Sequence, residues 1–347
     1  MMVIGIDAHK RTHTAVAADQ LGRKLSARTV GTTSSDHLTL LKWARAQADQ
    51  ERLWALEDCR NMTRRLERDL IAAGERVVRV PPKLMAHARD SARTYGKSDP
   101  IDALAIARAA LREPDLPIAR LDGVEREIRL LVDHREDLVA ERTRAITRLR
   151  WHLHELDPAW TPPGKLERTS AYDRVASHLA RFDGLVTRLA KALVEHCRRL
   201  TVEIDELPPE IGERVEQVAP SLLAIVGCAA LTAAKIVGET AGVDRFKSKD
   251  AFARHNGTAP LPVWSSNRAR HRLSRTGNRQ LNAAIHRIAL TQARCHPEAR
   301  ELLARRKAGG DGGMEALRIL ERRLSDVVYR AMLADIEQES AETTTAT

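Results

Sequence analysis

The chain has 347 residues, of which 57 are lysine or arginine and 47 are aspartate or glutamate, so its formal net charge is +10. This length is sufficient for two or three domains with hydrophobic cores. The positive charge favours a polyanionic partner over an acidic protein or a small substrate. Aromatic residues make up only 3% of the chain, which argues against a surface that binds single strands mainly by base stacking.

The cysteines and the hydropathy pattern indicate the cellular compartment. Four cysteines lie far apart and form no CxxC pair, which predicts a reducing compartment and no structural zinc site. Asp7 interrupts the apolar run at the start of the chain, so no signal peptide is expected. No apolar stretch approaches the ~20 residues that a membrane span needs. The sequence therefore predicts a soluble intracellular protein with no membrane partner.

The N-terminal part has the pattern of a mixed sheet. Three short strands are expected first, at Val3–Ile6, at Thr12–Ala18 and after the turn Leu21–Gly22. The pattern continues with a helix from Ser34, a strand that ends on Glu57, a helix over Met62–Ala73 and a strand before Pro81. Three hairpin strands followed by alternating helix and strand are the order of a ribonuclease-H-like fold, so an α/β domain is predicted here.

Four acidic residues are predicted to converge in this domain. Asp7 would lie on the central strand and Glu57 at the end of its neighbour, so that both carboxylates point into one cleft. Asp99 and Asp102 are three residues apart at the start of a helix and share one face of it. Taken alone, this pair favours capping, with Asp99 as the cap and Pro100 in the first turn. Taken with Asp7 and Glu57, it supplies four acids at one point.

The four acids predict a metal site. Carboxylates crowded into one cleft repel one another unless a cation offsets their charge. Hard oxygen ligands select Mg²⁺ or Mn²⁺, and two such ions ~4 Å apart are the usual arrangement for phosphodiester chemistry. His9 and Lys10 follow Asp7 closely and are interpreted as turn or phosphate-contacting residues, not as ligands.

The middle of the chain predicts a helical hairpin. Apolar residues recur at intervals of three and four from Val124 to Leu156, and a second helix repeats the pattern from Val175 to Ile204. Prolines and a glycine between them force a turn, and a coiled coil is the expected packing. Such an arm is either an intramolecular strut or a dimerisation element. The stretch Leu207–Gly212 is predicted to mark the next boundary.

The C-terminal part is predicted to be mostly helical. A tight turn at Gly227 joins two helices, and such turns aim backbone N–H groups at phosphate in helix–hairpin–helix modules. Ala229 stands where a second glycine is usual, so a plain helical hairpin is an equal alternative. An apolar helix is expected from Leu281, then a last amphipathic helix, and the tail over residues 341–347 is predicted to be disordered.

An arginine-rich stretch, Trp264–Asn282, contains two adjacent serines and no acid, and no acid occurs anywhere between Asp250 and Glu298. The planar arginine side chain binds phosphate oxygens bidentately, which predicts a nucleic-acid backbone held next to a serine hydroxyl. The alternative is a solvated basic loop that only adds affinity. The candidate phosphate contacts are Arg268, Arg270, Arg272, Arg275 and Arg279.

Together these motifs resemble the DEDD transposases of the insertion-sequence one-ten family. The stretches GIDAHK, ALED and KSDPIDALAIA are similar to the family's acidic tetrad, and GTAPLPVWSSNRARHRLSRTGNRQLN with EALRILERRLSD is similar to its C-terminal transposase domain. The resemblance covers nearly the whole chain in the same order. It implies a RuvC-like domain over residues 1–118, a coiled-coil helical hairpin over 119–210 and a transposase domain over 211–340.

The resemblance also implies roles for single residues. The four acids would hold Mg²⁺, and Ser266 would be the nucleophile. The family has a glycine after this serine where this chain has Asn267, a residue that tolerates a left-handed backbone better than most. Ser265 is the alternative nucleophile. The serine would attack a DNA phosphodiester, giving a protein–DNA phosphoester and a free 3′-OH, and strand exchange and religation would follow.

The implied partners are double-stranded donor and target DNA and a structured non-coding guide RNA, a bridge RNA that base-pairs with both DNAs. Because the acids and the serine lie on different domains, a homodimer or homotetramer is expected, located in the cytoplasm at the nucleoid. Two alternatives stay open at this point. One is a RuvC-like metal-dependent junction nuclease that uses water, and the other is an inactive transposon protein that only binds nucleic acid.

Overall fold

The structure is a computed structural model. It describes residues 1–347 except 48–50, 58–61, 91–97, 114–115, 117, 120–122, 266–267, 274–276 and 346–347, and it also leaves out the side chains of 83, 90, 262–265, 268–273, 339–340 and 342–345. The chain divides into two compact units, Met1–Gly123 with Thr240–Ala334, and Val124–Glu239 with Asp335–Thr347. Within the described residues, no helix is long and apolar enough to span a membrane.

A five-stranded mixed sheet in the order β3-β2-β1-β4-β5 forms the N-terminal part. Its strands are β1 (Met2–Ala8), β2 (His13–Ala18), β3 (Lys24–Val30), β4 (Arg52–Glu57) and β5 (Arg76–Val80). Strand β2 is antiparallel to β1 and β3, whereas β4 is parallel to β1 and β5 is parallel to β4. The five strands predicted from the sequence are confirmed, and their order is consistent with a ribonuclease-H-like sheet.

Helices cover both faces of this sheet, so β1 is buried along its whole length. On one face, α1 (Ser34–Gln47) and α2 (Arg64–Ala72) pack in one core cluster with Ile4 and Ile6. On the other face, α3 (Pro82–Asp90) and α4 (Asp99–Arg112) pack in a second cluster with Val3. Successive strand residues point to opposite faces, so Gly5 and Asp7 share the α4 face with Val3.

Gly5 allows the backbone of α4 to approach the backbone of β1. A Cβ atom at Gly5 would lie 2.6 Å from the Ala107 nitrogen and closer still to the Ala103 carbonyl oxygen. Ala103 and Ala107 are themselves fully buried, small residues. The helix therefore lies on the central strand with almost no side-chain layer between them, which fixes the start of α4 relative to the end of β1.

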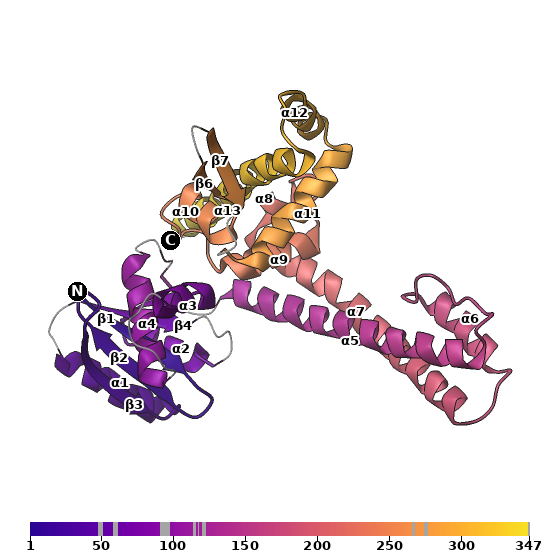
Figure 1. The fold of residues 1–347 in the computed structure, drawn as a ribbon, viewed down its shortest axis with the longest axis horizontal. Helices are drawn as coiled ribbons and strands as arrows, with labels where there is room; N and C mark the ends of the chain where they lie inside the picture. The colour runs from indigo at the N-terminus through magenta and orange to yellow at the C-terminus, as the bar shows by residue number, and fades with distance from the viewer. Residues whose placement is uncertain are drawn as a thin grey trace. The chain divides into compact units, whose positions relative to one another are not determined.

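The second unit contains the predicted helical arm. Helix α5 (Val124–Leu156) has the predicted limits, and α7 (Leu185–Val218) runs beside it (Figure 1). The second helix of the prediction is in fact two helices, because α6 (Thr169–Leu179) ends before Gly184. Gly184 has φ +96°, a left-handed conformation that interrupts a helix. The arm is therefore a helical hairpin with a third helix packed on it, and its coiled-coil packing stays a prediction.

Helix α7 continues through Leu207–Gly212, the segment predicted to mark a boundary, with Pro208 and Pro209 inside the helix. Proline removes a backbone hydrogen bond and normally ends or kinks a helix. Here Ile204 and Ile211 are buried on either side of the prolines, so packing holds the helical path. The helix is therefore not interrupted at this segment, and the predicted domain limits stay a prediction.

Helices α8 (Pro220–Leu223) and α9 (Ala230–Thr240) follow, joined by the predicted turn at Gly227, whose φ is +89°. Lys235 of α9 is 3% exposed, and its Nζ atom lies 2.8 Å from the Glu136 carboxylate of α5. This ion pair, with its buried lysine, connects α9 to the arm. Phosphate contact by the turn and the plain helical hairpin both stay predictions.

The remaining elements are α10 (Lys249–Asn256), β6 (Pro260–Ser265), β7 (Arg268–Leu273), α11 (Arg279–Cys295), α12 (Pro297–Ala308) and α13 (Gly313–Thr345). The first part of the arginine-rich stretch, predicted as a loop, belongs to the antiparallel hairpin of β6 and β7. Its arginines hide the apolar alternation that normally marks a strand. The tail predicted to be disordered is helical as far as Thr345, because extending an existing helix costs little.

Replacing Gly5 with alanine is expected to destabilise the N-terminal part by about 3 kcal/mol or more, because the added Cβ overlaps backbone atoms of α4 that have no room to move. Denaturant unfolding followed by fluorescence of buried Trp54 measures this change. Gly212→Ala is the matched control, since its Cβ would lie 3.7 Å from the Ala230 Cβ in ordinary contact. Equal stabilities of the two variants would contradict the close approach.

His13 should make the stability of the sheet pH-dependent. Burial lowers the pKa of His13 from 6.5 to about 4, with the neighbouring His37 adding to the effect. Below pH 6.5 the unfolded chain therefore binds a proton that the folded chain excludes, and the free energy of unfolding falls until pH reaches about 4. The loss is about 2 kcal/mol by about pH 5. Urea unfolding of wild type and of His13→Asn, above pH 6.5 and at about pH 5, checks this prediction. The free energy of unfolding should fall by about 2 kcal/mol less in the variant than in wild type.

Candidate active site

Asp7 and Glu57 lie side by side at one edge of the sheet. The parallel register pairs Ile6 of β1 with Leu56 of β4, so the next residue of each strand is one of the two acids. Because the carboxyl ends of parallel strands meet at the same edge, both acids lie at that edge. Asp7 is only 6% exposed, whereas Glu57 is partly exposed. The predicted juxtaposition of these two strand ends is therefore present.

Asp99 and Asp102 lie in the first turn of α4, the helix that packs on β1 through Gly5. Ser98, and not Asp99, is the N-cap residue, and no side chain makes a capping hydrogen bond there. The prediction that Asp99 caps the helix is therefore wrong, since its carboxylate is engaged elsewhere. Asp102 is buried, and the side chain of Asp99 is about half exposed. The helix start thus presents one buried and one accessible carboxylate.

His9 joins the strand end to the helix start. Its Nε2 atom lies 3.2 Å from Asp7 Oδ2 and 3.3 Å from Asp99 Oδ1. One ligand atom from each of these three residues falls within 4.8 Å of the others, a spacing that suits a metal ion. The interpretation of His9 as only a turn or phosphate-contacting residue therefore missed a candidate ligand. Its position two residues after a strand-end carboxylate was the available signal.

The charges of the other three acids act on Asp7. Burial is the largest cause that raises the pKa of the Asp7 carboxyl, His9 acts in the opposite direction, and the charges of Asp102, Asp99 and Glu57 raise the pKa further. Charges act in this way only over short distances in a partly buried site. The structure thus brings the four predicted acids to one place, although they are distant in sequence.

Arg89 supplies a positive charge at this site. Its Nη1 atom lies 3.3 Å from Asp102 Oδ1, so α3 contributes a cation to the start of α4. No sequence pattern predicts this contact, because it depends on how α3 and α4 pack. His9 contacts Asp7 and Asp99 and Arg89 contacts Asp102, so three of the four acids have a basic side chain beside them.

The donor set suits a hard divalent cation. Carboxylate oxygens are the preferred ligands of Mg²⁺ and Mn²⁺, and imidazole is accepted by Mn²⁺ more readily than by Mg²⁺. The buried Asp7, whose ionised form is disfavoured by its own surroundings, would gain the most from such an ion. The arrangement can therefore hold a metal and place it at the open edge of the sheet.

The predicted serine and arginines belong to the hairpin of β6 and β7. Ser265 ends β6 and pairs with Arg268, and the register pairs Val263 with Arg270 and Leu261 with Arg272. The three arginines thus occupy alternate positions of one strand. Ser266, Asn267 and Arg275 lie outside the described residues, and the side chains of the paired hairpin residues are likewise not described. Arg279 is the exposed first residue of α11.

Two family models match the chain. One, described as a transposase and named for the DEDD type of IS110, matches residues 4–158, which include all four acids. The other, described as the transposase IS116/IS110/IS902 family, matches residues 219–304, which include the serines and the arginine-rich hairpin. The two matches lie in the order expected from the motifs of the chain.

Two relatives that match over nearly their whole length come from insertion elements. A 44.8 kDa uncharacterized protein of insertion element IS116 from Streptomyces clavuligerus is 29% identical over 380 residues, covering 96% of this chain and 94% of the relative. A 42 kDa uncharacterized protein of insertion element IS900 from Mycobacterium paratuberculosis is also 29% identical, covering 99% of this chain and 98% of the relative.

Among solved structures, RuvC from Thermus thermophilus is similar to the chain both alone and in complex with a Holliday junction substrate. Each comparison has 16% identity and a TM-score of 0.28 over 34% of this chain, and covers 100% and 99% of the RuvC chains respectively. The family models and the full-length relatives carry the assignment without this likeness. The chain belongs to the IS110 family of transposases, the family that also includes IS116 and IS902.

Proposed function

We propose that this transposase cleaves and rejoins DNA through a covalent serine–DNA intermediate at a site that also needs its four acids. The observation that supports this proposal best is the convergence of Asp7, Glu57, Asp99 and Asp102 on a partly buried point, with His9 between two of them. A carboxylate cluster of this kind is retained where a cation is required. Phosphodiester chemistry on DNA is the reaction of a transposase.

The four acids, with His9, would hold Mg²⁺ or Mn²⁺. When bound, such an ion polarises phosphate oxygens and stabilises the charge that develops on them in the transition state. Asp7 and Glu57 are fixed by the sheet, and Asp99 and Asp102 by α4. Because strand ends and a helix start are rigid, they present the ligands with little loss of side-chain and backbone freedom.

Ser266 is the proposed nucleophile, with Ser265 as the alternative. Its Oγ atom would bond to the phosphorus atom while the bond from phosphorus to O3′ breaks, and the hydroxyl proton would end on the released 3′ oxygen. Arginines at alternate positions of β7, Arg268, Arg270 and Arg272, are proposed to contact the phosphate on which negative charge builds. Arg275 and the exposed Arg279 are proposed to hold the neighbouring backbone.

The partners proposed are double-stranded donor and target DNA and a structured guide RNA. The positive net charge of the chain and the absence of any acid between Asp250 and Glu298 favour polyanions. Base pairing by an RNA would supply sequence choice that the arginine contacts to phosphate do not. A homodimer or homotetramer is proposed as the active form, with the helical arm of α5 and α7 as its contact.

Asp7→Asn is expected to weaken binding of Mn²⁺ at least tenfold, since it removes the most buried carboxylate of the site. Isothermal titration of the metal into the protein without DNA measures this change. Asp205→Asn serves as the control, because this acid is exposed on α7 in the other compact unit. Equal affinities of the two variants would contradict the metal site and leave the fold assignment intact.

Ser266→Ala is expected to abolish an SDS-resistant protein–DNA adduct, because the alanine has no oxygen to bond to phosphorus. The protein is co-expressed with RNA from the DNA that flanks its gene and assayed on that DNA with Mg²⁺. Ser265→Ala is assayed in parallel to identify the nucleophile. The serine whose replacement abolishes the adduct is the nucleophile, and the serine whose replacement leaves the adduct is not. Cleavage without an adduct, unchanged in both variants, would favour water as the nucleophile, as in a junction nuclease.

A further inference from the structure

The two ends of the serine-bearing hairpin are joined at its base. The chain enters the hairpin after Asn256 and leaves it at Asn278, whose backbone N–H donates to the His255 carbonyl at 2.6 Å. Gly257 has a left-handed φ of +77°, and a Cβ added at Gly277 would lie 2.5 Å from its Cα atom. The entering and leaving strands therefore touch backbone to backbone, in a contact that only glycine permits.

The side chain of Asn256 holds the entering strand in this conformation. Its Oδ1 atom accepts hydrogen bonds from the Thr258 backbone N–H at 3.0 Å and from the Thr258 hydroxyl at 2.7 Å. Because the Thr258 N–H can only donate, the amide orientation is fixed, and Nδ2 faces the opposite way. The Asn256 side chain therefore bridges the left-handed turn at Gly257 and sets the direction in which β6 begins.

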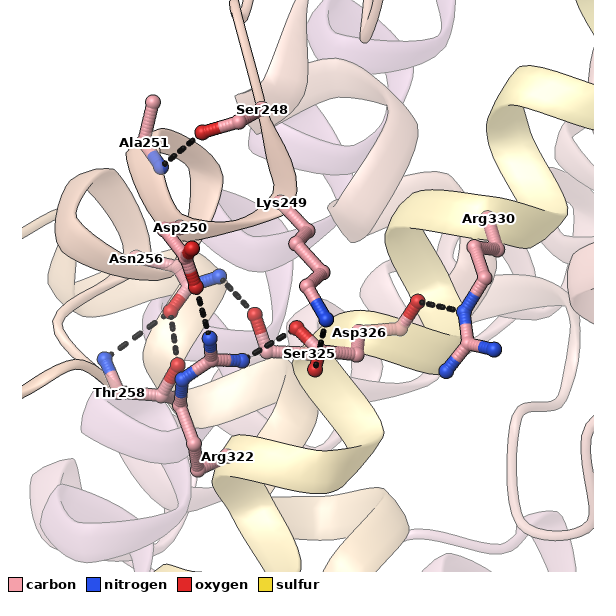
Figure 2. A network of polar contacts seen from close by, with 10 residues as sticks. All are labelled: Ser248, Lys249, Asp250, Ala251, Asn256, Thr258, Arg322, Ser325, Asp326 and Arg330. Carbon is pink, nitrogen blue, oxygen red and sulfur yellow. Dashed lines mark hydrogen bonds and ion pairs between the residues drawn. The ribbon is translucent and has the colours of Figure 1, made fainter.

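The same side chain ties the hairpin to α13. Its Nδ2 atom donates to the Ser325 hydroxyl at 2.8 Å, and both residues are completely buried (Figure 2). A second asparagine, Asn282 of α11, donates from its Nδ2 atom to the Asn256 carbonyl at 3.0 Å. One residue thus links α10, α11, α13 and the start of β6 through four hydrogen bonds.

Ion pairs between α10 and α13 surround this buried centre. Arg322 Nη2 lies 2.6 Å from Asp250 Oδ1, Arg322 also contacts Asp326, and Lys249 Nζ lies 3.7 Å from Asp326 (Figure 2). These charged groups are partly exposed, so each contributes little on its own. They hold the two helices in the register that brings Asn256 opposite Ser325.

A buried amide bonded through both its oxygen and its nitrogen favours one conformation, because turning it away leaves buried polar groups unsatisfied. An apolar residue at this position would fill the space between α10 and α13 equally well. It would not bond Thr258, so the direction of β6 would be left to Gly257, which permits many conformations. The amide therefore contributes to the hairpin's orientation rather than to the helical core alone.

We propose that Asn256, held by Ser325, is a positioning residue for strand cleavage: it fixes the base of the β6/β7 hairpin, and through it the serine, without touching DNA. The proposal rests on the proposed function of the hairpin serine. It predicts two separable effects of losing the amide, a less ordered hairpin and slower chemistry at unchanged DNA affinity.

The order of the hairpin is measured by hydrogen exchange of the backbone amides of β6 and β7 in the full-length protein. Ser325→Ala removes one acceptor at almost constant volume and should speed exchange in the hairpin about 10-fold. Asn256→Ala should speed it more, and Asn256→Asp, which keeps acceptors for Thr258 and for the Ser325 hydroxyl, should restore part of the protection. Thr291→Val is the control, since it removes a hydroxyl hydrogen bond from α11 outside this network.

Faster exchange in the hairpin, with α11 and the sheet of β1 to β5 unchanged, supports the proposal. Unchanged exchange in the hairpin of Ser325→Ala and Asn256→Ala overturns it, as does equal loosening of α10, α11 and α13. If Asn256→Ala does not fold, Ser325→Ala and Asn256→Asp decide alone. Hydrogen exchange reports on the hairpin even if wild type forms no adduct. The measurement therefore distinguishes a failure of the serine mechanism from a failure of this inference.

The chemical effect is measured as the rate of adduct formation at saturating DNA, beside the DNA affinity. Ser325→Ala should lower the rate about 10-fold or more with an affinity within about twofold of wild type. Asn256→Asp should recover part of that rate. A loss of affinity with an unchanged rate at saturation would overturn the positioning role and assign Asn256 to nucleic-acid binding.

Discussion

The acidic site depends on the contact between Gly5 and the backbone of α4. Without a Cβ on the central strand, the helix can lie directly against it, and the first turn of α4 comes to the edge where β1 and β4 end. Asp99 and Asp102 then meet Asp7 and Glu57, although more than ninety residues separate the first acid from the last. A larger residue at Gly5 would move the helix and with it half of the carboxylates. The packing of two backbones is thus a condition of the chemistry.

The charges at this edge favour binding of a cation, because a cation would offset the repulsion among the carboxylates. Burial and three neighbouring carboxylates disfavour the ionised form of Asp7, and His9 acts in the opposite direction. His9 also lies between two acids from different elements, Asp7 and Asp99, and Arg89 contacts Asp102. The carboxylates of this site repel one another, so the surrounding fold is what keeps them close together.

The hairpin of β6 and β7 is stabilised in a different way from the acidic site. It is a two-stranded ribbon, an element that is marginal in isolation, and its base is tied to neighbouring helices. There, two glycines in contact and one buried asparagine connect it to three helices. The acids are fixed by a large hydrophobic core, whereas the base of the hairpin is held by a small polar one. This difference makes the orientation of the hairpin sensitive to single hydrogen bonds.

The sequence by itself determined the strands, their acids and the limits of α5. A buried strand appears in the sequence as a short apolar run. An acid at the end of such a run lies at the carboxyl edge of the sheet, so Asp7 and Glu57 could be placed from their positions alone. The family's motifs added the serine. Only the tertiary structure decided the rest: the bridging of His9, the approach of Arg89, the break at Gly184, the helical path through Pro208 and Pro209, and the pairing of Asn256 with Ser325. Periodicity reports whether a residue is buried, but the partner that it meets there is chosen by packing between segments distant in sequence.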